Sequence, residues 1–232
     1  MAQRKKRIPK EQRRTQILNA AVSVFAEKGY RKASITEIND KARIARGTFY
    51  LYFESKQDIF LELVESYFDG YARILDENHA RLEKALGNGT DPLVAQRQNA
   101  FDIFHYHASH PALTDIVYRE GIGRDEDFTA RVSELAGLAR AQLTEGFRLM
   151  ASKGMIRECD IELVTSMTMG AVMSITSEHI LGEKRKDIKN VADEFVDMMI
   201  RALAPPGLNS EKAIELSKQR RDDEKLRARA SA

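Results

Sequence analysis

Hydrophobic positions along this chain recur mostly with the spacing of α-helices. In Glu11–Lys28 the apolar residues fall at steps of three and four, and Gly29 follows as a stop signal. Similar patterns, bounded by glycine, proline or capping residues, predict further helices over about 56–86, 93–109, 112–120, 125–153, 160–181 and 187–204. Strand patterns are nearly absent, so the sequence predicts an all-α protein.

Residues 34–42 predict a short amphipathic helix with a defined start. Ser34 and, three residues later, Glu37 form a capping box, in which each residue satisfies a backbone N–H group of the first turn. Ile35, Ile38 and Ala42 recur at helical spacing and give the helix an apolar face. We therefore expect one side of this helix to pack on a core while the other stays in water.

A second short helix is expected after a two-residue turn, over about 45–52. Phe49 and Phe53, four residues apart, form its buried side. A second capping pattern, Ser55 followed by Asp58, then restarts the chain as a longer helix. Two short helices joined by a tight turn and followed by an anchored helix are typical of a helix-turn-helix that reads DNA.

The outward side chains of the second helix suit contacts to DNA. Such a helix fits the major groove, and arginine is the side chain best suited to bidentate pairing with guanine, so Arg46 is the expected base-specific contact. Gly47 lets the backbone approach the DNA closely. Lys56 and the N–H groups at the start of the following helix can share a phosphate. The hydroxyl groups that suit base edges or phosphate oxygens belong to Thr48, Tyr50 and Tyr52.

The charge of the chain is concentrated near its beginning. Residues 1–56 hold 14 Lys or Arg residues against 5 Asp or Glu residues, a net charge of +9, whereas the whole chain carries only +2. The basic run Arg4–Arg7 can act as a loose arm that neutralises phosphates or enters a minor groove. The alternative is a solvated tail that only aids solubility.

The composition limits the class of protein. A chain of 232 residues with 43% hydrophobic content is large enough for two domains. Cys159 is the single cysteine, which excludes an internal disulfide framework and fits a reducing compartment. The sequence holds no signal-peptide pattern and no run of about 18 uncharged apolar residues, the length that a membrane span needs. A cytoplasmic protein is expected.

The helices at about 160–181 and 187–204 predict a homodimer. No residue between Glu162 and Glu178 is charged, and the next helix carries one wide apolar stripe. A helix without a wet face must be covered on more than one side. Pairing with the same helices of a second copy would bury this surface and supply the twofold axis that a palindromic DNA site requires. The alternative is that both helices complete the core of a monomer.

Large apolar side chains in the body suggest a small-molecule effector site, although ordinary core packing explains the same pattern. The expected lining is apolar or aromatic with a polar anchor at His105, Glu178 or His179. Its other members are Phe101, Phe104, Tyr118, Phe147, Met150, Met167 and Met173. His105 and His107 lie two residues apart and face different sides of a helix, so no metal site and no cofactor are predicted.

An enzyme is disfavoured, because the chain has no phosphate-binding glycine loop, nucleophile elbow or H-E-x-x-H motif. The remaining alternative to a regulator is an effector-blind DNA-binding or architectural protein, which differs in that no small molecule lowers its DNA affinity. The expected domains are a DNA-binding head over 1–56, an effector-binding and dimerisation body over 57–204 and a charged tail over 205–232. The tail has too few apolar residues for a core and is expected to form a fraying charged helix or to stay disordered.

The beginning of the chain resembles the TetR family of bacterial transcriptional regulators. The motifs F-x-x-x-G-Y, G-T-x-Y-x-Y-F and S-K appear in order between Phe25 and Lys56. The resemblance implies an all-helical homodimer that acts as a ligand-released repressor of a DNA operator. Family DNA contacts map onto Thr36 in addition to the six residues chosen above. Two positions depart from the pattern: Arg43 replaces a glycine in the turn, and Ala45 replaces a hydroxyl cap that contributes about 1 kcal/mol.

Overall fold

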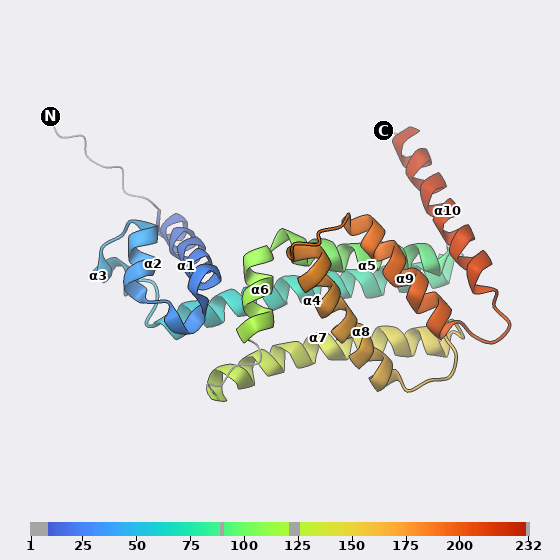
Figure 1. Ribbon diagram of the computed structural model, residues 1–232, viewed down its shortest axis with the longest axis horizontal. Helices are drawn as coiled ribbons and strands as arrows, with labels where there is room; N and C mark the ends of the chain where they lie inside the picture. The colour runs from blue at the N-terminus through green and yellow to red at the C-terminus, as the bar shows by residue number, and fades with distance from the viewer. Residues whose placement is uncertain (1–8, 89–90, 121–125, 231–232) are drawn as a thin grey trace. The chain divides into compact units, whose positions relative to one another are not determined.

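The computed structural model describes residues 9–88, 91–120 and 126–230, which are helical apart from their connections (Figure 1). The fold is all-α, as the sequence predicted, and no strand occurs within these ranges. The helices are α1 (Lys10–Lys32), α2 (Ile35–Ala42), α3 (Arg46–Phe49), α4 (Lys56–Asn88), α5 (Pro92–Ser109), α6 (Pro111–Glu120), α7 (Glu126–Ser152), α8 (Ile161–Ile175), α9 (Ile188–Leu203) and α10 (Ser210–Ala230). A π-helical segment, η1 (Thr176–Leu181), follows α8 directly.

Three elements differ from the predicted boundaries. The recognition helix was expected over about 45–52, but α3 has only four residues and the chain then turns. The helix expected to reach residue 181 changes to π-helix at Thr176. The charged tail, expected to form a fraying helix or to stay disordered, forms the helix α10, which packs against α5 and α9.

The chain divides into two compact units, each described here by itself. The first comprises Met1–Phe68 with His110–Leu135, and the second comprises Asp69–Ser109 with Ala136–Ala232. The first unit therefore groups the first turns of α4 and the whole of α6 with helices α1, α2 and α3. No helix in the described ranges is long and apolar enough to cross a membrane.

The first unit is built around α1. Ile17, Ala21 and Phe25 of α1 and Ile38 of α2 are buried, and α1 packs against both α2 and α6. The rings of Phe25 and Phe60 meet edge to face with centroids 5.2 Å apart. Helices α1, α2 and α3 are drawn in blue in Figure 1. This packing gives the short helices α2 and α3 a rigid support.

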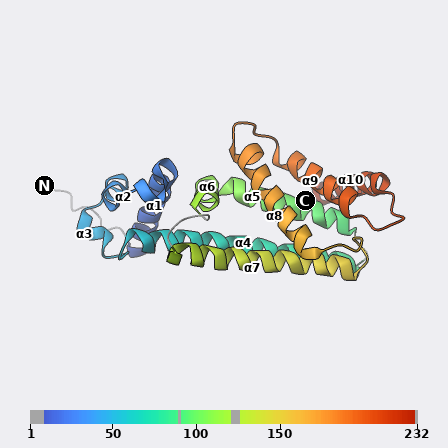
Figure 2. The same cartoon turned by 60° about the horizontal axis from the view of Figure 1, so that its bottom comes forward.

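The second unit is built around α5, which packs mainly against α9 (Figure 2). One apolar cluster joins Phe104 of α5, Val172 of α8, Ile180 of η1 and Val196 of α9. A smaller cluster joins Phe147 of α7, Val164 of α8 and Leu203 of α9. The long helices α4 and α7 are linked by a hydrogen bond of 2.6 Å from Gln142 to Asp76.

Candidate nucleic-acid interface

Helix α2 begins where the sequence predicted. Ser34 is its N-cap and the capping box with Glu37 is complete: the Glu37 N–H donates to Ser34 Oγ at 3.3 Å, and the Ser34 N–H donates to a Glu37 carboxylate oxygen at 2.9 Å. At the other end, Gln16 Nε2 of α1 donates to the carbonyl oxygen of Ala42 at 2.7 Å. Both ends of α2 are thus fixed, and Thr36 stays exposed on its first turn.

The turn between α2 and α3 passes through Arg43 in the left-handed conformation, with φ 52° and ψ 48°. Its N–H donates to the carbonyl oxygen of Asp40 at 3.1 Å, and the Ile44 N–H donates to that of Asn39 at 3.0 Å. A non-glycine residue in this region costs about 1–2 kcal/mol, which is the penalty expected from the missing glycine. The turn nevertheless closes with the geometry that a helix-turn-helix requires.

Helix α3 presents three of the expected DNA contacts to solvent. Arg46 and Gly47 are exposed, and a Cβ atom added to Gly47 would meet nothing within 4 Å. Tyr50 is 48% exposed, although the edge of its aromatic ring contacts Phe49 at a centroid distance of 5.5 Å. Thr48 and Tyr52 are half-buried. The face therefore combines a guanidinium, an open stretch of backbone and a phenol.

Two phenylalanines hold this face in place. Phe49 is fully buried and Phe53 is 2% exposed, with ring centroids 5.7 Å apart, as their four-residue spacing predicted. The Arg14 guanidinium lies 5.0 Å from the centre of the Phe53 ring and pairs with Glu62 of α4. Because Arg14 comes from α1, the helix that carries the core of the head also fixes the end of the recognition segment.

Lys56 has a surrounding that the sequence did not indicate. Its ammonium group donates to the carbonyl oxygens of Tyr30 at 2.8 Å, Arg31 at 3.3 Å and Ala33 at 2.9 Å, and it lies 4.5 Å from the centre of the Tyr30 ring. These carbonyls belong to the frayed end of α1, where Gly29 has a positive φ. An ammonium has three N–H donors. A phosphate contact by Lys56 stays a prediction, and clamping α1 to α4 is the role that its hydrogen bonds demonstrate.

The start of α4 is capped by the second pattern identified in the sequence. The Asp58 N–H donates to Ser55 Oγ at 3.0 Å, and the Glu54 N–H donates to an Asp58 carboxylate oxygen at 2.9 Å. Asp58 also places a negative charge in the first turn, where it interacts favourably with the helix dipole.

Several basic side chains of the head are paired with carboxylates. Lys28 pairs with Glu37, and Lys41 pairs with Glu27. The hydrogen bond from Lys28, with those from Ser34, lowers the pKa of Glu37 from 4.5 to about 2. The basic residues that remain exposed near the reading face include Arg43 and Arg46. The basic run predicted to act as an arm lies outside the described residues.

The residues expected to line an effector site are not brought together. Phe101 and Phe104 belong to the apolar cluster of α5, α8 and α9, whereas Phe147 and Met150 belong to the smaller cluster at the end of α7. Tyr118 lies in the other compact unit. The type of a side chain does not indicate which apolar cluster it joins, so the sequence did not separate these residues.

The other members of that set lie at the surface. Met167 is 66% exposed and Met173 is 37% exposed on α8, and Glu178 is exposed on η1. His105 is exposed too, with its ring stacked on Phe101 at a centroid distance of 5.5 Å. The two methionines therefore cover no internal cavity of this chain. Across the described ranges, no group of three or more His, Cys, Asp or Glu side chains has a metal-binding arrangement.

Comparison with known proteins identifies the head. A family model described as "Bacterial regulatory proteins, tetR family" matches residues 17–63, which span most of α1, all of α2 and α3, and the start of α4. The match thus covers the helix-turn-helix and the elements that support it.

Relatives extend the likeness over the body. The chain is 24% identical over 190 residues to the fatty acid metabolism regulator protein of Bacillus subtilis (strain 168), which covers 80% of this chain and 92% of that protein. It is 26% identical over 197 residues to the probable acrEF/envCD operon repressor of Escherichia coli (strain K12), with 83% and 87% covered. Both relatives are named as regulators or repressors rather than as enzymes.

Solved structures show the same fold. The fatty acid degradation regulator FadR from Bacillus halodurans superposes with a TM-score of 0.68 at 23% identity, covering 88% of this chain and 99% of that one. FadR from Bacillus subtilis in complex with stearoyl-CoA gives a TM-score of 0.63 at 21% identity, with 80% and 96% covered. The solved structures show that the fold is shared. The helix-turn-helix, the family match and the names of the relatives agree that the chain is a transcriptional regulator rather than an enzyme and that it belongs to the TetR family.

Proposed function

We propose that this protein is a cytoplasmic, homodimeric repressor that binds a palindromic operator and is released from it by a small, largely apolar effector. The exposed face of α3 carries the DNA-binding part of the proposal, because Arg46, Gly47 and Tyr50 project from a head whose core is complete without them. In this proposal the DNA contacts are made by Thr36, Arg46, Gly47, Thr48, Tyr50 and Tyr52, with Lys56 holding the head together.

A dimer with twofold symmetry would supply the DNA affinity and specificity that a single head lacks. A four-residue helix reaches few base pairs, and one such module buries too little surface for tight specific binding. Two heads placed one helical turn of DNA apart read a palindrome and combine their affinities. The proposal therefore needs a dimerisation surface on the body.

Exposed apolar side chains on α8 and α9 support such a surface. Leu163 is 58% exposed and Met167 is 66% exposed on α8, and Met198 is 62% exposed on α9. Gly170 lies on the same open side of α8, with room around its Cα for a close helix. Large apolar side chains that stay exposed in a single chain are typical of protein interfaces. We assign Met167 to the dimer rather than to an effector pocket.

The dimer is tested by placing a charge on this face. Met167→Glu and Met198→Glu should shift the protein to monomer in sedimentation velocity while its helical content stays unchanged, because both side chains are exposed in the single chain. Gln219→Glu, at an exposed site of α10, adds the same charge as a control. A double variant that sediments as the wild-type dimer would place the interface elsewhere.

The class of effector is suggested by the relatives and by the core. The Bacillus subtilis relative is named for fatty acid metabolism, and the FadR structure contains stearoyl-CoA. In this chain, Phe101 and Phe104 supply apolar surface on α5. The hydroxyls of Thr168 and Thr176 are buried on the inner side of α8 and η1 and have no hydrogen-bond partner among the described residues. An acyl thioester matches an apolar lining that carries a few hydroxyl donors.

The effector is tested with an operator recovered by selection. Stearoyl-CoA should lower operator binding in fluorescence anisotropy, whereas coenzyme A without the acyl chain should not. Thr176→Val should weaken the response to stearoyl-CoA without lowering operator affinity, because the hydroxyl has no structural partner to lose. If no acyl-CoA of any chain length alters operator binding, the acyl effector is refuted and the effector-blind alternative is favoured.

A further inference from the structure

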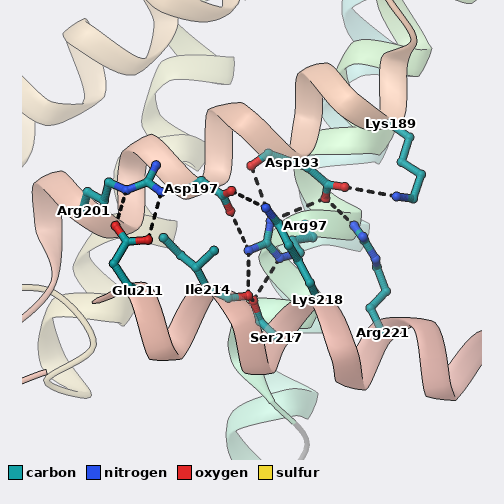
Figure 3. A network of polar contacts seen from close by, with 10 residues as sticks. All are labelled: Arg97, Lys189, Asp193, Asp197, Arg201, Glu211, Ile214, Ser217, Lys218 and Arg221. Carbon is teal, nitrogen blue, oxygen red and sulfur yellow. Dashed lines mark hydrogen bonds and ion pairs between the residues drawn. The ribbon is translucent and has the colours of Figure 1, made fainter. Parts of the chain in front are cut away.

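Charged residues of three helices converge on one buried arginine in the second unit (Figure 3). The side chain of Arg97, on α5, has no exposed surface. Its Nη2 donates to Asp197 Oδ1 of α9 at 2.6 Å, and its Nε donates to Ser217 Oγ of α10 at 3.0 Å. Its Nη1 lies 3.4 Å from Asp193 Oδ1 of α9. A single guanidinium thus joins α5, α9 and α10.

Helix α10 adds two cations to this centre. Arg221 pairs with Asp193, and Lys218 Nζ lies 2.5 Å from Asp197 Oδ2. The least exposed members are Arg97 and Arg221 against Asp193 and Asp197, with side-chain exposures between 0% and 12%. Lys189 of α9 also pairs with Asp193, at 3.2 Å, but its side chain is 43% exposed. The four least exposed charges balance only when α10 is in place, because without it the buried Arg97 guanidinium faces two carboxylates.

Two further ion pairs lie at the margins of this contact. Arg201 of α9 pairs with Glu211 at the start of α10 at 2.7 Å. Arg220 of α10 pairs with Asp91, next to α5, at 2.9 Å. The ion pairs are spread along α10 and reach both helices on which it lies.

Few apolar residues of α10 take part in this contact. Ile214 is the member of the large apolar cluster that comes from α10, and it is 5% exposed. A buried ionic network contributes little net stability, but it fixes the geometry of the groups that it joins, because removing one partner leaves an uncompensated charge. The network therefore specifies how α10 sits on α9 and α5 more than it strengthens the fold.

The position of this contact on α9 links it to the proposed dimer. Asp193 and Asp197 are four residues apart and lie on one side of α9, where α10 covers them. Met198 follows Asp197 directly and projects about 100° away around the helix, where it is 62% exposed. Helix α10 thus packs on a side of α9 different from the one that the proposed dimer uses.

We propose that α10 is a latch that, through Arg97, holds α9 in the position required for dimerisation. Arg97 and Ser217 act as positioning residues, since neither reaches the exposed face of α9. The proposal rests on the homodimer proposed above. It predicts that loosening α10 weakens the dimer although no residue of the dimer face has changed.

The test compares two variants of α10 that introduce the same residue. Ser217 is fully buried against Arg97, so Ser217→Arg brings a third guanidinium, beside those of Arg97 and Arg221, into a space that holds a hydroxyl. Gln219→Arg places the same charge at an exposed site two residues away. Sedimentation velocity over a range of concentrations gives the dimer dissociation constant, and hydrogen exchange followed by mass spectrometry reports whether α10 has come away.

For Ser217→Arg we expect faster exchange in α10 and a dimer dissociation constant raised about tenfold or more, within the usual size of a coupling between sites. Gln219→Arg should leave the exchange rate of α10 and the dimer dissociation constant within about twofold of wild type, because surface substitutions usually have small effects. A Ser217→Arg protein with a released α10 and unchanged dimerisation would overturn the latch. A wild-type chain that is monomeric at every concentration would refute the homodimer itself.

A milder variant covers the case in which Ser217→Arg does not fold. Lys218 is 39% exposed, and Lys218→Glu sets a carboxylate against Asp197 at the edge of the network. For Lys218→Glu we again expect faster exchange in α10 and a raised dimer dissociation constant, with both effects smaller than in Ser217→Arg. Lys218→Glu with faster α10 exchange and a wild-type dissociation constant would count against the latch as directly as the first variant.

Discussion

Replacing Lys56 by methionine tests how the DNA-binding head is held together. The substitution keeps most of the hydrocarbon stem and removes the ammonium, so the carbonyl oxygens of Tyr30, Arg31 and Ala33 lose a shared donor. A hydrogen bond contributes about 0.5–1.5 kcal/mol net, and more when one partner is charged. The contact with the Tyr30 ring adds about 0.5–1 kcal/mol.

Lys56 is only half-buried, so water replaces part of what is lost. We therefore expect Lys56→Met to lower the free energy of unfolding by about 2–3 kcal/mol, a large share of the stability of a domain. The assay is urea unfolding followed by circular dichroism. Lys41→Met is the control, because its exposed pair with Glu27 contributes at most about 1 kcal/mol.

The salt dependence of operator binding separates the clamp from a direct phosphate contact. Operator affinity is measured at several salt concentrations under conditions in which Lys56→Met is folded. The slope of log affinity against log salt concentration should match that of wild type, because the wild-type ammonium is engaged with α1. A slope smaller by about 0.9 would show that Lys56 neutralises a phosphate. Wild-type stability combined with that smaller slope would refute the reasoning from its hydrogen bonds.

Three further outcomes follow from the head. Tyr50→Ala should weaken operator binding in anisotropy with little change in unfolding, since the ring is 48% exposed; equal loss of both would make Tyr50 structural. Asn39→Ala should raise the free energy of unfolding by about 1 kcal/mol, because the amide is buried and both its polar atoms lack partners among the described residues; a clear loss in urea unfolding would reveal a bonded amide. Because its folded-state pKa is lowered to about 2 from 4.5, Glu37 contributes stability above pH 4.5 that is lost as pH falls toward 2. Glu37→Gln keeps the capping box but loses the charge pairing with Lys28, so the difference between wild type and variant in urea midpoint should shrink over that range, and a constant difference would contradict the assignment.

Features set by neighbouring residues could be predicted from the sequence. The capping boxes at Ser34 and Ser55 were identified because donor and acceptor lie three residues apart. The buried pair Phe49 and Phe53 followed from helical spacing in the same way. Helix α3 is shorter than expected because the chain continues after Phe49 as turns, in which the N–H groups of Leu51 and Tyr52 donate to carbonyls three residues back.

Features that depend on distant parts of the chain could not be predicted. Lys56 finds its carbonyl partners on α1, more than twenty residues away, where no local pattern points to them. Arg97 was overlooked because charged side chains are rarely buried, although Asp193 and Asp197 interrupt an otherwise apolar stripe of α9. Met167, predicted to line a pocket, is 66% exposed; its apolar side chain alone does not reveal which face of its helix is covered.

Selection of DNA from a random pool of duplexes, with the mass of the selected complex measured, tests the central claim most directly. The account predicts an enriched sequence with twofold symmetry, bound by an even number of chains, and a loss of preference at one base pair of each half-site in Arg46→Ala. An enriched but asymmetric site bound by one chain would contradict the dimeric reader. No enrichment at all would mean that the head binds DNA through charge alone.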